Sequence, residues 1–154
     1  MDTDPAGGIE EAVESSIREA STWLGWDGHP RGAEGSVWTP HKALRRVVDH
    51  LIDHLAQTEA ALGDTPALPD TWKGRFATLP GEWAPFTEAD LREAEARLRR
   101  LGAVYAGRLR AAGPARWDTD RGTEWTIRRM AEHCAESLAW YAAQPMGRPV
   151  PMPD

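Results

Sequence analysis

Apolar side chains recur every three or four positions in four separate segments of the chain, the spacing that gathers them on one face of an α-helix. The segments span about residues 8–24, 39–62, 87–112 and 123–144. No segment shows the alternation of apolar and polar positions, with β-branched residues, that is typical of a strand. The pattern therefore predicts an all-α fold, a four-helix bundle that forms a single domain over residues 1–154.

Residues that favour helix ends support these ranges. Thr39 precedes Pro40, which joins an N-cap hydroxyl to the residue best tolerated at the first helical position. Thr87 has an acidic residue three positions later, close to a capping box, and Gly63 is a natural helix end. The tail over residues 145–154 contains four prolines and is predicted to be extended.

The connections after the first and second predicted helices are long, spanning about residues 25–38 and 63–85. Loops of this length in a small domain usually carry a function or are disordered. Disordered segments are poor in aromatic residues, whereas these two loops contain four of the eight tryptophans: Trp26, Trp38, Trp72 and Trp83. We therefore expect the loops to pack on the bundle and to close a pocket beside it.

Composition and charge exclude several classes of protein. The apolar runs are too short to span a bilayer, and the first residues lack the basic and apolar regions of a signal peptide. A net charge of −6 provides no electrostatic footprint for nucleic acid. The single cysteine excludes an internal disulfide and a cysteine-rich zinc module. These features predict a cytoplasmic protein that binds neither nucleic acid nor membranes.

Residues 45–56 in the second predicted helix resemble residues 128–139 in the fourth. Both begin with Arg-Arg, continue with two apolar residues and an acid, and have a histidine at the sixth position. The tenth position holds a histidine in the first copy and a serine in the second. Each copy also follows a Trp-Thr pair, although the gap to the arginines differs by four residues. The repeat predicts that the two helices present related edges.

The histidines of this repeat, His50, His54 and His133, are the candidate metal ligands. At about 100° per residue, both His50 and His54 lie beside the apolar stripe of their helix, and His133 lies on the matching edge of the fourth helix. If the two helices are neighbours, the three imidazoles converge in or beside the core. Neutral imidazoles suit zinc, nickel, iron and copper. Because histidine pairs at this spacing also occur by chance, histidines that bind no metal remain the alternative.

Other side chains near these positions carry weaker expectations. Ser137 and Trp140 lie on the same helix edge as His133 and are candidates for the wall of a pocket. Cys134 falls in the apolar stripe, so we expect a buried thiol rather than a nucleophile, which would need an exposed setting and a lowered pKa. Asp49 points away from the apolar stripe and is expected to face solvent or to pair with an arginine.

The length, the helix order with its long connection after the second helix, and the paired Trp-Thr…Arg-Arg…His segments resemble the DinB/YfiT-like superfamily over about residues 38–144. The resemblance implies a bundle of the DinB type, a divalent metal ion and assembly as a homodimer. In that superfamily one histidine usually comes from the second helix and a His-x-x-x-His pair from the fourth. Here Ser137 replaces the second histidine of the pair, and the second helix carries both His50 and His54. The metal site is therefore either rearranged or lost.

The resemblance also implies a function. Relatives transfer low-molecular-weight thiols, so the leading expectation is a metal-dependent enzyme that transfers mycothiol or a similar thiol onto a small electrophilic substrate, with zinc, nickel or iron as the cofactor. Two alternatives remain open from the residues themselves. One is a metal-free bundle that binds a small molecule or a partner, and the other is a metal-free enzyme that uses a histidine as general base.

Overall fold

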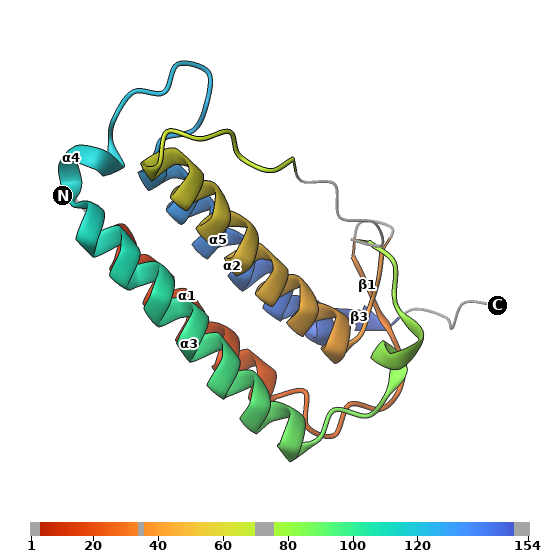
Figure 1. Cartoon of the computed structure of the whole chain (residues 1–154). Helices are drawn as coiled ribbons and strands as arrows, with labels where there is room; N and C mark the ends of the chain where they lie inside the picture. Colours follow the sequence, from red (N-terminus) through yellow and green to blue (C-terminus); the bar gives the residue numbers. More distant parts are fainter. Residues whose placement is uncertain (1–3, 34–35, 70–75, 150–154) are drawn as a thin grey trace.

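The computed structural model describes residues 4–33, 36–69 and 76–149. Four long helices run side by side (Figure 1): α1 (Pro5–Ser21), α2 (Pro40–Leu62), α3 (Glu88–Ala112) and α5 (Ile127–Ala143). Helix α1 packs against both α3 and α5, while α2 packs mainly against α5. The described chain is thus mostly helical, in agreement with the prediction, and the two helices with the histidine repeat are direct neighbours.

Threonines begin three of these helices. The Thr87 hydroxyl accepts a hydrogen bond from the Asp90 backbone N–H, and the Asp90 carboxylate accepts one from the Thr87 N–H, which completes the predicted capping box. Thr39 caps α2 and Thr126 caps α5 in the same way, each with its hydroxyl on the N–H three residues later. Both helices that carry the candidate ligands therefore begin immediately after a Trp-Thr pair.

Two helices differ from their predicted ranges by a few residues. The first begins at Pro5 because the Asp4 carboxylate caps it through the Ala6 N–H, and it ends at Ser21 rather than near residue 24. The chain leaves the helix there, and Trp23 is buried against Phe86. The last helix begins at residue 127 rather than 123, since Thr126 is its cap.

The structure also contains short elements that the periodicity did not predict. Helix α4 (Pro114–Trp117) and two 3₁₀ turns, η1 (Pro80–Trp83) and η2 (Gln144–Met146), lie in the connections. Strands β1 (Arg31–Ala33), β2 (Ser36–Trp38) and β3 (Arg148–Pro149) form an antiparallel sheet in the order β2-β1-β3. Strands of two or three residues are too short to show an alternating pattern. The predicted extended tail is therefore partly a strand, and residues 150–154 lie outside the described range.

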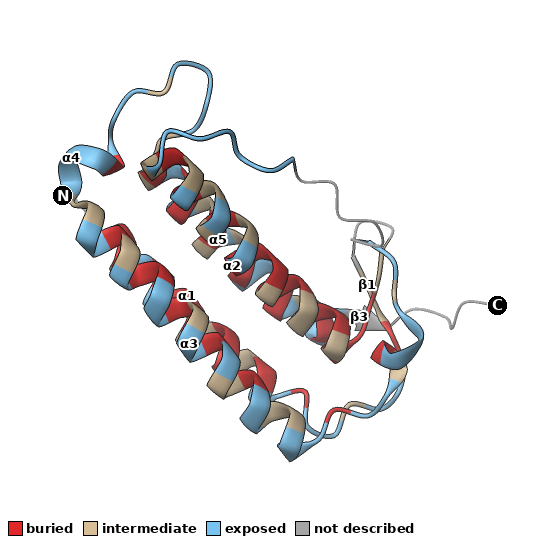
Figure 2. Ribbon diagram, viewed as in Figure 1, coloured by how far each residue is buried: buried red, intermediate tan, exposed pale blue. Residues whose placement is uncertain are grey.

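The buried residues of the four long helices lie mainly along the sides that face one another, coloured red in Figure 2. The long loops fold back onto α2, where the buried Lys42 ammonium donates to the carbonyl oxygens of Val37 and Phe76 and to the Thr78 hydroxyl. Burial lowers the pKa of Lys42 to about 8. The expectation that the loops pack on the bundle is confirmed for Trp38, which is buried, whereas Trp72 lies outside the described residues.

Gly102 lies where α3 packs tightly against Val13 of α1, and it provides a test of the packing. A Cβ added there would lie 2.9 Å from Cγ2 of the buried Val13, a β-branched side chain with few rotamers. We expect Gly102→Ala to lower the free energy of unfolding by about 1–2 kcal/mol, because the steric cost exceeds the gain in helix propensity. Urea denaturation measures this difference.

Gly107 is the matched control, since it lies in the same helix and no described atom is within 4 Å of an added Cβ. Gly107→Ala is expected to raise the free energy of unfolding by about 0.5–1 kcal/mol. If both variants were stabilised equally, α1 and α3 would not be in close contact at Gly102.

Candidate metal centre

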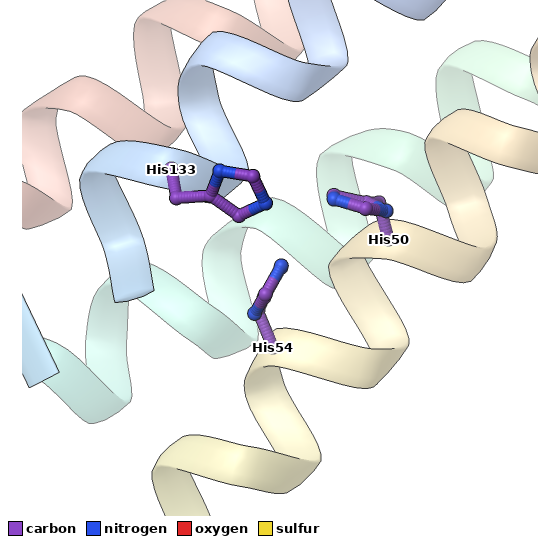
Figure 3. A group of neighbouring side chains, drawn as sticks. All are labelled: His50, His54 and His133. Carbon is purple, nitrogen blue, oxygen red and sulfur yellow. The ribbon is translucent and has the colours of Figure 1, made fainter. Parts of the chain in front are cut away.

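Three imidazoles converge where α2 faces α5. His50 and His54 lie one turn apart on α2, each with only 6% of its surface exposed, and His133 extends from α5 and is half-buried. Their potential ligand nitrogens all lie within 4.8 Å of one another. Figure 3 shows that each ring turns a nitrogen toward the space between the three side chains. The histidines that the repeat selected are therefore close enough to hold one metal ion.

The donor set fits a divalent transition metal. Nitrogens bound at about 2.1 Å to one ion are at most about 4.2 Å apart, so an adjustment of about 1 Å in the widest pair brings all three into range. Three neutral imidazoles suit zinc, nickel, iron or copper. The three histidines leave at least one coordination position for another ligand, the arrangement of a reactive rather than a structural site.

Hydrogen bonds orient two of the rings. His54 Nδ1 lies 2.9 Å from the Gln57 side-chain oxygen. Because that oxygen can only accept, the bond places the proton on Nδ1, and Nε2 is then the nitrogen that would bind a metal. The Ser137 hydroxyl lies 3.4 Å from His133 Nε2. Ser137, the repeat equivalent of His54, therefore contacts a candidate ligand directly.

The environment of His133 favours its neutral form. Burial, together with the nearby Arg129 guanidinium, lowers the pKa of His133. The Trp125 ring packs edge-on against the imidazole at a centroid distance of 4.8 Å, and the Arg129 guanidinium lies over the same indole. A metal binds only the deprotonated imidazole nitrogen, so this setting prepares His133 to act as a ligand near neutral pH.

A buried network of charged and polar side chains lies next to His50. The Tyr141 ring lies 5.2 Å from the His50 ring, and the fully buried Arg46 guanidinium donates to the Tyr141 hydroxyl. Arg46 also donates to the Asp49 carboxylate at 3.1 Å. Of the two expectations for Asp49, pairing with an arginine is confirmed. Exposure to solvent is not, because the residue is buried. Burial raises the pKa of the Asp49 carboxyl despite the neighbouring arginines.

Cys134 links the two helices that carry the ligands through a side-chain contact. Its side chain is fully buried, and Sγ lies 3.8 Å from the His50 carbonyl oxygen, to which the thiol donates. Burial raises the pKa of this thiol well above its usual value. The prediction of a buried cysteine is confirmed, and the thiol contributes to packing rather than to nucleophilic chemistry.

The three histidines open onto a cavity of about 400 Å³. The residues beside them in its wall include Gln57, Arg121, Thr123, Glu124 and Trp125. Most of these belong to the segment between α4 and α5, so the loop before α5 forms one side of the cavity. A volume of this size is typical of sites that bind small molecules.

Several residues expected near the pocket lie elsewhere. Trp140 packs edge-on against Trp38 at 5.6 Å, is 41% exposed and is not among the residues that line the cavity. Trp26 lines a separate small cavity. The expectation that the loop tryptophans close the pocket is therefore wrong for Trp26 and Trp38, and Trp125 takes that place. The Trp-Thr pair was the signal in the sequence that could have identified Trp125.

No protein-family model, curated protein or solved structure matches this chain. Across the described residues, none of the helices combines the length and the apolar character needed to cross a membrane.

Proposed function

We propose that this protein is an enzyme that binds a divalent metal through His50, His54 and His133 and acts on a small molecule in the adjoining cavity. The observation that carries the proposal is the convergence of the three ligand nitrogens within 4.8 Å at the wall of a 400 Å³ cavity. A site enclosed on all sides would serve structure alone, whereas this one leaves room for a substrate next to the ligands.

The chain's own residues divide into clear roles under this proposal. The three imidazoles hold the ion, and Gln57 fixes the orientation of His54 through the bond to Nδ1. Trp125 packs edge-on against His133 and forms part of the cavity wall beside it. A divalent ion in such a site supplies Lewis acidity, which lowers the pKa of a thiol or water that it coordinates.

A thiol nucleophile at this site would have to come from outside the chain. Cys134 is the single cysteine, and it is buried with a raised pKa, so the protein has no thiol of its own to offer at the cavity. The resemblance to the DinB/YfiT-like superfamily favours a low-molecular-weight thiol in this role. We therefore propose thiol transfer onto a small electrophile as the reaction.

Metal content and turnover test the proposal together. Protein purified in chelator-free buffer is expected to contain about one equivalent of zinc, nickel or iron by elemental analysis. With a low-molecular-weight thiol and a chromogenic electrophile, the metal-loaded protein is expected to consume the thiol faster than protein stripped by a chelator, because only the loaded site lowers the thiol pKa.

Two results would contradict the proposal in different ways. A correctly folded protein that binds no transition metal, even when one is supplied in excess, would favour a metal-free binding bundle. Turnover that is equal with and without metal, and lost in His133→Ala, would favour a histidine acting as general base.

A further inference from the structure

Arg121 stands out among the residues that line the cavity. It is the only arginine or lysine among the described residues of the wall. The wall also contains one acidic residue, Glu124. The Arg121 guanidinium donates to the backbone carbonyl oxygen of Trp125 at 2.9 Å, and the Trp125 indole packs edge-on against His133. The guanidinium is therefore fixed on the loop that faces the three histidines.

Most arginines on this protein are neutralised by a carboxylate, but Arg121 is not. Arg110 pairs with Glu10, Arg99 with Glu14, and Arg128 with Asp118. Within residues 4–33, 36–69 and 76–149, no carboxylate forms an ion pair with Arg121, whose one hydrogen bond goes to a neutral backbone oxygen. Four of its five N–H donors therefore make no hydrogen bond within the described residues.

The net charge of the metal-loaded site also favours a negatively charged ligand. Three neutral imidazoles leave the two positive charges of a divalent ion uncompensated, and Arg121 adds a third. Glu124, which is exposed, offsets only one of these charges. A ligand that carries negative charge at both ends is best matched to this cavity.

We propose that the cavity selects a thiol that also carries a carboxylate, with the sulfur directed to the histidine site and the carboxylate bound by the Arg121 guanidinium. This inference rests on the proposed function, since it places the sulfur at the metal. Arginine provides a planar fork that matches a carboxylate with two parallel hydrogen bonds. Arg121 is therefore a specificity residue, and it distinguishes thiols of similar size by their charge.

Three small thiols test this selection: 3-mercaptopropionate, 2-mercaptoethanol and cysteamine, which carry a carboxylate, a neutral hydroxyl and an ammonium group. Protein loaded with Co²⁺ reports sulfur coordination directly through the sulfur-to-cobalt charge-transfer absorption. We expect 3-mercaptopropionate to bind at least about tenfold more tightly than 2-mercaptoethanol, because hydrogen bonds between charged groups are the strong ones. Cysteamine is expected to bind most weakly.

Variants assign the preference to Arg121. Arg121→Gln is expected to remove the preference for 3-mercaptopropionate while leaving 2-mercaptoethanol binding unchanged, which shows that the loop is intact. Arg121→Lys is expected to retain part of the preference, since the charge remains without the fork. Arg116→Gln is the matched control, because Arg116 also donates to a backbone carbonyl, that of Leu62, and does not line this cavity.

The outcomes separate this inference from the function on which it rests. Absence of a charge-transfer band with all three thiols would overturn the proposed thiol chemistry. Equal binding of the three thiols, stronger binding of cysteamine through Glu124, or a preference that survives in Arg121→Gln would overturn the carboxylate selection alone.

Discussion

Replacing His133 with alanine is expected to weaken Zn²⁺ binding by more than about 100-fold while the helices remain folded. Residues that merely orient metal ligands change affinity by about 10–100-fold, so the loss of a ligand should exceed that range. His133 is the one candidate ligand that α5 provides, and without it only the two α2 histidines remain. Because His133 is half-buried and borders the cavity, its removal leaves no large void in the core.

Competition with a chromophoric chelator measures this affinity, and other positions provide the controls. His29→Ala removes an exposed imidazole on a loop and is expected to leave the affinity unchanged. Unchanged Zn²⁺ binding in His133→Ala would show that the three histidines do not form one site.

The sequence repeat suggests a double variant that tests the same metal site by a gain of Zn²⁺ affinity rather than by a loss. Ser137 is the repeat equivalent of His54, and its hydroxyl already lies 3.4 Å from His133 Nε2. Exchanging the two residues, with His54→Ser and Ser137→His together, moves the histidine pair from α2 to α5. We expect the double variant to bind Zn²⁺ more tightly than His54→Ser alone. No recovery would mean that the two helix edges are related in sequence but not in geometry.

Asp49→Asn is expected to cause the largest loss of stability among the charged residues, about 3–5 kcal/mol in the free energy of unfolding. Arg46 is fully buried, and Asp49 is the carboxylate that accepts its hydrogen bond. Removing that charge leaves the guanidinium desolvated without an ionic partner, the costly way to disrupt a buried pair. Because the pKa of Asp49 is raised by burial, the pair itself adds little net stability, and the loss reflects the charge left behind.

Urea denaturation of two further variants isolates this effect. Glu93→Gln disrupts the exposed pair with Arg97 on α3 and is expected to cost less than about 1 kcal/mol. Combining Arg46→Met with Asp49→Leu removes both charges and is expected to recover most of the loss, since apolar replacements of buried pairs are often neutral. A cost in Asp49→Asn no greater than in Glu93→Gln would place Arg46 in contact with water.

The helices and the histidine cluster could be predicted because short-range rules control them. Periodicity located the long helices, and the Trp-Thr pairs contained the N-cap hydroxyls of Thr39 and Thr126. The repeat placed His50 and His133 on matching edges, and convergence followed once α2 and α5 proved to be neighbours. Local sequence was sufficient for the helices and for the matching edges, whereas the convergence also required that α2 and α5 pack together.

The cavity and the buried charges could not be predicted in this way because they depend on how the loops fold back. A helical wheel places Asp49 away from the apolar stripe, but the loop after α2 covers that side: Arg45 pairs with Glu82 of η1, and Lys42 binds Phe76. Arg121 and Trp125 lie in the irregular segment before α5, where no periodicity indicates which side chains face the histidines.

The burial of Cys134 makes the thiol a reporter of motion at the interface between α2 and α5. With one cysteine in the whole chain and no exposed thiol surface in the folded protein, a thiol-reactive reagent can modify only molecules that have opened at this interface. The modification rate then follows the population of the open form when closing is fast relative to the reagent. Since the thiol donates to the His50 carbonyl, this opening also separates the imidazoles, so ligands that join the two helices should slow labelling in proportion to their occupancy.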